Sequence, residues 1–495
     1  MARTMDADQP KNIVLTESSG KGEIVSDRSP VLEHPIFIAL RWFNSGISDY
    51  ANAIRTTMPI VVKSTVTAAE RIQKKLDGFV VEDHGKVTLK AHGPHAAKEM
   101  IDTIDEGDRL SRSRLPEVVA RSFFIGFFTL YDAFIGTLLK AIYSRQPELF
   151  KSIKREISLS DLLEFDDIAL VKSDMLEKEI DSFRRDSYVE QFLKLESKLE
   201  IKTLRDFPEW KQFVEMGQRR NLFTHNDGYV SQQYLASCDK EGVQFAKRPT
   251  IGERLSLDPD YLIDSLFIIG KVGFMLGHTL WRKVLPNELA IANDAFNQSL
   301  YDLLREQRWK SAAEYGLFGL STLLRQNLPE VEYKIRLINT AIGLKKSKRM
   351  DEAKRLLASA DWTACLREFS LAKAVIEDQR NEAANIMLKI GRQGEIIDQL
   401  SYHIWPLFDE FRGTQQFLDA YRSVYGIDFI EKASEKVVDR TETMRSEARA
   451  KVRTEVTPKQ NRARAAAESP TIVPSTRGKA APKARKASRR TIEEK

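Results

Sequence analysis

Long amphipathic or apolar stretches, rather than alternating ones, dominate the hydrophobic pattern of this chain. The pattern predicts long helices at about 117–144, 179–199, 207–224 and 258–283. The last helix has a clear start signal, because Asp258-Pro259-Asp260 supplies a cap and a first turn. Long helices that follow one another in this way favour an antiparallel bundle, here over residues 115–287. The sequence therefore predicts an all-α fold.

The region before this bundle, residues 31–112, is also helical in pattern. Apolar residues recur at three- and four-residue spacing over 47–76, although Pro59 is expected to kink or break a helix there. A short hairpin is predicted over residues 79–89, around His84-Gly85.

Beyond the bundle, residues 290–430 change to shorter helix pairs. A polar or basic turn followed by a helix with an early alanine recurs at Ala312, Ala353 and Ala383. These pairs resemble tetratricopeptide-type repeats, but the spacings of 41 and 30 residues depart from that family's repeat of about 34. Unrelated helical hairpins would give the same pattern. Because stacked helix pairs form a concave face, a protein or peptide partner is expected there.

Both ends of the chain are polar. Residues 1–30 predict a disordered lead, and residues 431–495 predict a charged helix followed by a basic disordered tail. The net charge of the chain is +6. The segment from Arg449 onward contains fourteen Lys or Arg and four Glu, so the rest of the chain is mildly acidic. The tail is either an RNA-contacting arm or a solvated segment that aids solubility.

Two apolar runs are long enough to raise the question of a membrane. The run at 122–139 contains Asp132, and the run at 262–281 is interrupted by Asp264, Lys271 and His278. Because unpaired charges are costly in lipid, we expect buried helices and no membrane partner.

The two cysteines limit which disulfide bonds and metal sites the chain can form. Cys238 and Cys365 lie far apart in sequence, so they predict neither a disulfide framework nor a zinc site. We therefore expect a cytoplasmic protein without a cofactor or a metal.

Candidate chemistry is concentrated near the end of the third predicted bundle helix. Arg220-Asn221 is followed by three residues and His225, and the stop signal Asn226-Asp227-Gly228 comes next. Asn221 and His225 are four residues apart on one helix face, so the amide can orient the imidazole. Arg220 and His225 point about 140° apart on an ideal helix, so two such helices across a twofold axis would be needed to bring them into one cleft.

This pattern resembles the hallmark of the HEPN superfamily (higher eukaryotes and prokaryotes nucleotide-binding domains), which contains many metal-independent endoribonucleases. The resemblance covers residues 115–287 and implies a helical bundle that dimerises and cuts RNA, with Arg220, Asn221 and His225 as catalytic residues. A plain structural interpretation is a helix C-terminus at which Arg and His satisfy the last carbonyls.

Each of the three side chains suits RNA cleavage by the neighbouring 2′-hydroxyl. An imidazole such as that of His225 titrates near neutrality and can act as a general base or acid. The guanidinium of Arg220 offers a fixed charge and a planar fork for phosphate oxygens. The family resemblance implies that Asn221 holds the imidazole or a phosphate oxygen, and that the products are a 2′,3′-cyclic phosphate and a 5′-hydroxyl.

Supporting residues are also expected around the motif. Asp132, if buried, must face a partner, and pairing with Arg220 or Arg219 would position a guanidinium. Asp132 and Glu215 are the candidates for the acidic residue that the family often places near the motif arginine, while Arg219 either adds a phosphate contact or is solvated.

Two functions of different classes follow from the sequence. The first is an endoribonuclease, such as a defence or toxin-like effector, that is regulated by its helical repeats. The second is a non-catalytic dimeric interaction scaffold. The complete Arg-Asn…His set favours the first, because a scaffold has no need of all three.

Overall fold

The computed structural model describes residues 30–83, 86–154, 156–326 and 328–429, and it confirms the predicted all-α class. The predicted disordered lead (except Pro30) and the predicted basic tail lie outside the described residues. The chain divides into two compact units, residues 1–417 and 418–495. In the second unit, the described residues hold the end of α19 (Gln415–Tyr425), where the Tyr421 ring contacts the rings of Tyr425 and Phe429.

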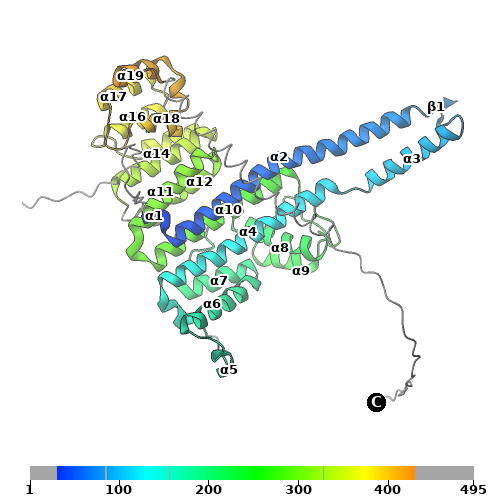
Figure 1. The fold of residues 1–495 in the computed structure, drawn as a ribbon, viewed down its shortest axis with the longest axis horizontal. Coiled ribbons are helices and arrows are strands. Elements are labelled where there is room, and N and C mark those ends of the chain that lie inside the picture. Colours follow the sequence, from blue (N-terminus) through cyan, green and yellow to red (C-terminus); the bar gives the residue numbers. More distant parts are fainter. Residues whose placement is uncertain (1–29, 84–85, 155, 327, 430–495) are drawn as a thin grey trace, which may run out of the picture. The chain divides into compact units, whose positions relative to one another are not determined.

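Helix α2 (Pro35–Asp77) is the longest element of the described chain and runs along the bundle helices (Figure 1). Phe37, Leu40 and Phe43 near its start are fully buried, and this part packs against α4 and α10. The helix continues through Pro59, which lies in an exposed part of α2, so the proline does not end it as the sequence allowed. The first half of α2 therefore belongs to the bundle core rather than to a separate N-terminal region.

The far half of α2 is mostly exposed, and helix α3 (Pro94–Ser111) packs along α2 after the hairpin that follows it. Strands β1 (Val80–Asp83) and β2 (Lys86–Leu89) form the predicted hairpin, with Val80 opposite Leu89 in antiparallel register. Helix α3 then runs back along α2 (Figure 1). The hairpin and the two helix ends form an extension beyond the bundle.

The bundle itself is filled by aromatic side chains from α4 (Leu115–Arg145). Phe124, Phe127, Phe128, Tyr131 and Phe134 on this helix are fully buried. The helices and short connecting elements that follow α4 in this region are η1 (Pro147–Ser152), α5 (Leu159–Leu162), α6 (Ile168–Arg185), α7 (Tyr188–Leu199), α8 (Trp210–His225), α9 (Gln232–Lys240) and α10 (Pro259–Val284). Aromatic rings interlock from helix to helix, as where Tyr131 contacts Tyr188 and Phe213 edge to face.

The helix predicted over 179–199 is in fact two helices. Ser187 stands between α6 and α7 as an N-cap, accepting a hydrogen bond from the Glu190 amide, while the Glu190 carboxylate accepts one from the Ser187 amide. This capping box starts a new helix and turns the chain. The break matters because it places Arg184, Arg185 and Tyr188 at a corner beside α8.

Within the described residues, two helical segments have the length and apolar composition of a membrane span, Pro94–Arg145 and Pro259–Val284. In the second segment, 72% of the apolar window is buried inside the protein, and in the first 56% is buried. Lys271, which interrupts the second run, forms ion pairs with Glu209 at 2.7 Å and Glu314 at 3.0 Å. These contacts fit core helices of a bundle, as expected.

The region after the bundle consists of helical hairpins, as predicted. Its elements are η2 (Pro286–Glu288), α11 (Leu289–Arg305), α12 (Trp309–Gly319), α13 (Thr322–Arg325), α14 (Glu330–Lys346), α15 (Met350–Ala358), α16 (Arg367–Ile376), α17 (Arg380–Ile390), α18 (Gln399–Ile404), η3 (Pro406–Phe408) and η4 (Phe411–Gly413); the short helix α1 (Pro30–Glu33) also contacts α11. The three alanines of the repeated pattern, Ala312, Ala353 and Ala383, are all fully buried.

One turn geometry recurs in three of these hairpins. Gln307, Lys348 and Asp378, each five residues before the buried alanine, adopt left-handed backbone angles with φ of 58°, 63° and 60°. The next residue donates its amide to the carbonyl five positions back, at 2.9 Å in each case: Arg308 to Leu303, Arg349 to Leu344 and Gln379 to Ala374. This is the Schellman pattern that ends a helix and turns the chain. The same turn therefore precedes each of the three buried alanines at the same five-residue spacing.

Candidate functional site

The motif helix α8 ends where the stop signal predicted, at His225. Asp227 and Gly228 follow in left-handed conformation, with φ of 48° and 84°, and the Gly228 amide donates to the Leu222 carbonyl at 3.1 Å. A side chain at Gly228 would also collide with Phe223. This turn fixes the last residues of α8, and with them the position of His225.

Arg220 on α8 pairs with Asp132 on α4. The Arg220 Nη2 atom lies 3.6 Å from Asp132 Oδ2, and both side chains are mostly withdrawn from solvent. The Tyr188 hydroxyl donates to the same carboxylate at 3.1 and 3.3 Å. Of the two acidic candidates named from the sequence, Asp132 is therefore the one that contacts the motif arginine.

Burial and charge pull the pKa of the Asp132 carboxyl in opposite directions. Burial raises it, while the positive charge of Arg220, the hydrogen bond from Tyr188 and the charge of Arg184 lower it, and the net pKa is raised above its usual value. Burial and the adjacent Asp132 carboxylate also raise the pKa of Tyr188 well above its usual value, so its hydroxyl keeps its proton and remains a donor. Arg184 completes the cluster by donating from Nε to the main-chain carbonyl of Asp132 at 3.1 Å.

Asn221 contacts Arg220 rather than His225. Its side-chain oxygen accepts a hydrogen bond from Arg220 Nη1 at 3.1 Å. Within the described part of the chain, the exposed His225 side chain makes no hydrogen bond or ion pair. The structure therefore holds the guanidinium from two sides and leaves the imidazole facing solvent one helical turn away. The expected orienting contact between Asn221 and His225 is not formed here.

Glu215 and Arg219, both named as supporting residues, lie on another face of α8 in a buried network. The Glu215 carboxylate accepts from Arg219 Nε at 2.7 Å, from the Tyr234 hydroxyl at 2.5 Å and from the Tyr261 hydroxyl at 2.6 Å. The Arg219 guanidinium stacks over the Tyr261 ring, 4.0 Å from its centroid. These contacts join α8, α9 and α10, so the two residues have a structural role instead of contacting Arg220 or His225.

A set of arginines beside the end of α8 was not found from the sequence. Arg114 and Arg254 each lie 3.3 Å from the Asp227 carboxylate, and Arg121 also pairs with it. The hydrogen bond from Arg121 contributes most to lowering the pKa of Asp227. Arg121 additionally donates to the Phe223 carbonyl, one of the free carbonyls at the helix end. These residues are far apart in the sequence, and no local sequence pattern predicts that they lie close together in the fold.

The chemistry of the described site is that of nitrogen donors rather than of metal ligands. Among the described residues, no group of three or more His, Cys, Asp or Glu side chains is placed to hold a metal ion. The motif instead offers a guanidinium, an amide and an imidazole, a combination suited to binding and protonating anionic oxygens.

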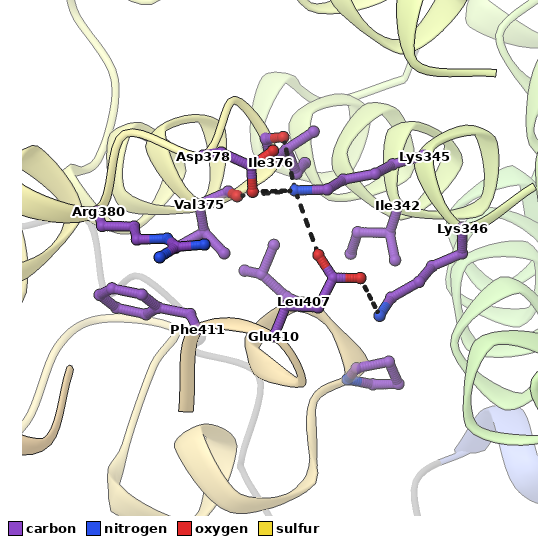
Figure 2. A pocket seen from close by; sticks show the side chains of 11 residues that line it. Ile342, Lys345, Lys346, Val375, Ile376, Asp378, Arg380, Leu407, Glu410 and Phe411 are labelled. Atoms are coloured by element: carbon purple, nitrogen blue, oxygen red, sulfur yellow. Dashed lines mark hydrogen bonds and ion pairs between the residues drawn. The ribbon is translucent and has the colours of Figure 1, made fainter. Parts of the chain in front are cut away.

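A small pocket lies among the helical hairpins, away from the motif (Figure 2). Lys345 pairs there with Asp378 at 2.6 Å, and Lys346 pairs with Glu410 at 2.8 Å. Lys345 also donates to the carbonyls of Val375 and Ile376, the last residues of α16. The volume of about 30 Å³ has room for little more than one water molecule. These lysines therefore tie α14 to the end of α16 and to the segment that carries Glu410.

Comparison with known protein families, with curated proteins and with solved structures finds no match for this chain.

Proposed function

We propose that this chain is a metal-independent endoribonuclease of the HEPN type, a homodimer that acts in the cytoplasm, as a defence or toxin-like effector regulated by its hairpin region. The observation that carries the proposal is the arrangement at Arg220. Its guanidinium is held by Asp132 and Asn221, and an exposed imidazole stands at the end of the same helix. Phosphoryl transfer without metal needs a fixed positive charge and a group that can exchange protons, and Arg220 and His225 offer one each.

The reaction follows from these roles. His225 takes the proton from the 2′-hydroxyl, whose oxygen attacks the adjacent phosphorus while the bond to the 5′-oxygen breaks. Arg220 stabilises the charge that develops on the phosphate oxygens. The leaving 5′-oxygen receives a proton from an imidazolium, so that the products are a 2′,3′-cyclic phosphate and a 5′-hydroxyl. Because Arg220 and His225 diverge on α8, the complete site uses two chains related by a twofold axis.

The test is cleavage of end-labelled RNA in EDTA by the purified full-length chain. His225→Ala and Arg220→Ala should each lower the rate by about 10²- to 10⁴-fold. His95→Ala, an exposed histidine at the start of α3, is the matched control and should keep full activity. Circular dichroism should show the same helix content in all four proteins.

The product end gives a second readout. A cyclic phosphate resists alkaline phosphatase until acid opens the ring, whereas a 3′-monophosphate does not. EDTA-resistant cleavage that persists at the wild-type rate in His225→Ala would remove the histidine from the mechanism. A wild-type chain that dimerises but cuts no RNA would favour the scaffold function instead.

A further inference from the structure

A pocket of about 230 Å³ lies beside the motif, between the α6–α7 corner and α8. The polar residues that line it include Arg184, Arg185, Asp186, Ser187, Arg220 and Asn221. Two of these, Arg220 and Asn221, belong to the motif itself. The pocket is therefore continuous with the proposed catalytic residues but is built largely by residues outside the motif.

The pocket carries an excess of positive charge. Arg185 is exposed and makes no hydrogen bond or ion pair within the described residues. Asp186, an acid in the same lining, is already paired with Lys194 at 2.6 Å. The Nε atom of Arg220 is buried and has no hydrogen-bond partner in the described part of the chain. The exposed Arg185 guanidinium thus retains its donors for a ligand with anionic oxygens.

The position of Arg184 depends on a close approach to α4. Its guanidinium lies directly over Gly136, where an added Cβ atom would collide with it. It also donates to the Asp132 carbonyl at 3.1 Å and lies 3.5 Å from Asp181. The ion pair with Asp181 is long, and that carboxylate is more than half exposed, so it neutralises Arg184 only weakly.

The part of α8 that lines the pocket includes the helix stripe on which His225 lies. Gly217, Asn221 and His225 follow one another at four-residue spacing, which places them along one stripe of the helix. His225 is then about 6 Å along the helix axis from Asn221, one turn beyond the last α8 residue that lines the pocket. This rise is comparable to the separation of neighbouring phosphates along a nucleic-acid strand.

We infer that this pocket binds a backbone phosphate of RNA next to the linkage that is cut. The inference rests on the proposed function and adds to it a subsite formed by Arg185 and Arg184. Guanidinium forks bind phosphate oxygens in pairs, and each such contact also fixes the register of the strand. The N-terminus of α7 is not the binding group, because Ser187 and Glu190 already satisfy each other there. With one phosphate in this pocket, the next lies one helical turn along α8, where the cleft of the proposed dimer brings His225 of one chain to Arg220 of the other.

The experiment measures binding separately from cleavage. The ligand is a short RNA with 2′-O-methyl groups, which lacks the nucleophile and cannot be cut, and binding is followed by fluorescence anisotropy at several salt concentrations. Arg185→Ala should raise the Kd roughly tenfold. It should also reduce the slope of log K against log salt by about 1. The control is Arg55→Ala, which removes the same charge from an exposed position on α2 and should change neither quantity.

A modified ligand identifies the group that is bound. Replacing single phosphates by neutral methylphosphonates should weaken binding to the wild type at one position of the strand, and that position should have no effect in Arg185→Ala. Addition of inorganic phosphate or a nucleoside monophosphate should compete weakly if the pocket takes a strand phosphate, and strongly if it takes a free one.

Each outcome decides the inference. Equal Kd and equal salt slope for Arg185→Ala and Arg55→Ala would overturn it, even if the wild type cuts RNA. Strong competition by the free nucleotide would replace the strand phosphate by a small ligand and would also overturn it. Selective weakening by Arg185→Ala, together with loss of the effect of one methylphosphonate, would support it even for a chain that fails the cleavage assay, so the two proposals fail separately.

Discussion

The carboxylate of Asp132 and the guanidinium of Arg220 lie 3.6 Å apart and connect the middle of α4 to the motif helix α8. Both side chains are less than a third exposed, at 22% and 28%. An ion pair at this depth loses much of its hydration and depends on further hydrogen bonds, which Tyr188 and Asn221 supply. The pair therefore fixes the direction of the motif arginine.

Asp132→Asn should weaken this arrangement without removing the shape of the side chain. The amide can still accept from Tyr188, but it leaves the charge of Arg220 without its partner. Because burial outweighs the attraction of Arg220 and raises the pKa of Asp132, the neutral amide avoids the cost of burying a charge, and we expect the free energy of unfolding at pH 7, measured by urea denaturation, to stay within about 1 kcal/mol of the wild type. Under the proposed function, cleavage should fall at least tenfold. Asp161→Asn, an exposed acid in α5, is the control and should change neither quantity.

The same variant should change the pH dependence of stability. Because the pKa of Asp132 is raised in the folded protein, the folded state holds this proton more tightly than the unfolded state does. The contribution of Asp132 to stability is then fully present below the unfolded-state value of 3.8 and is lost as the pH rises through the folded-state pKa. The substituted amide does not titrate, so urea midpoints of Asp132→Asn should decline less than those of the wild type across this window. A parallel decline would contradict the assignment.

Glu215 gives a prediction about stability alone. Its carboxylate is 9% exposed, and it receives hydrogen bonds from one guanidinium and two tyrosine hydroxyls. Glu215→Ala should lower the free energy of unfolding by about 3–5 kcal/mol, because it leaves the charge of Arg219 buried without a partner. Tyr261→Phe removes a single hydrogen bond and should cost about 1–2 kcal/mol. A loss below about 1 kcal/mol for Glu215→Ala would mean that water replaces the carboxylate.

The sequence predicted the motif helix and its end, and it offered Asp132 and Glu215 as two candidate acids, with Arg220 or Arg219 as the partner of Asp132. It did not show which of these residues share a face of α8. Asp132 stood out because a carboxylate within an apolar helix must find a partner. Glu215 and Arg219 lie near the motif in sequence, and helix periodicity alone did not show that their side of α8 meets α9 and α10. Arg121 and Arg254 reach the end of α8 from distant segments, and only the tertiary fold brings them together.

Local sequence patterns predicted those parts of the fold that depend on neighbouring residues. The helix class, the hairpin after α2 and the helix starts at the repeated alanines all follow from periodicity and turn residues. The break at Ser187 was missed because apolar residues on both sides of it, such as Phe183 and Tyr188, favour one continuous helix. The capping-box pattern of Ser187 and Glu190 was the signal that could have shown it. The turns at Gln307, Lys348 and Asp378 lack the glycine that usually marks a left-handed helix end, so their common geometry had no signal in the sequence.

Gly343 tests the packing of the hairpin region. A Cβ atom at this position of α14 would lie 2.7 Å from the backbone nitrogen of Ala313 on α12, and backbone cannot move aside as a side chain can. Gly343→Ala should therefore lower the free energy of unfolding by about 1–3 kcal/mol. Gly107→Ala on α3 is the matched control, since its Cβ would meet Ile72 at an ordinary 3.5 Å. That variant should be neutral or more stable by up to about 1 kcal/mol, because alanine favours the helix.

The composite site proposed for the dimer can be tested by mixing two inactive chains. Arg220→Ala and His225→Ala each lack one of the required groups. If each site takes Arg220 from one chain and His225 from the other, a mixed dimer has one complete site and one that lacks both groups. Unfolding the two variants together and refolding them should restore about one quarter of wild-type cleavage, because half of the dimers are mixed and each has one of its two sites intact.

Two controls make this result decisive. Each variant refolded by itself should stay inactive, and light scattering should give every sample a mass near twice that of the single chain. Refolded wild type sets the full scale. A dimeric mixture with no more activity than either variant alone would place Arg220 and His225 of the same chain in one site, against their divergence on α8. Recovery of activity in the mixture would assign the two side chains to opposite subunits of one site.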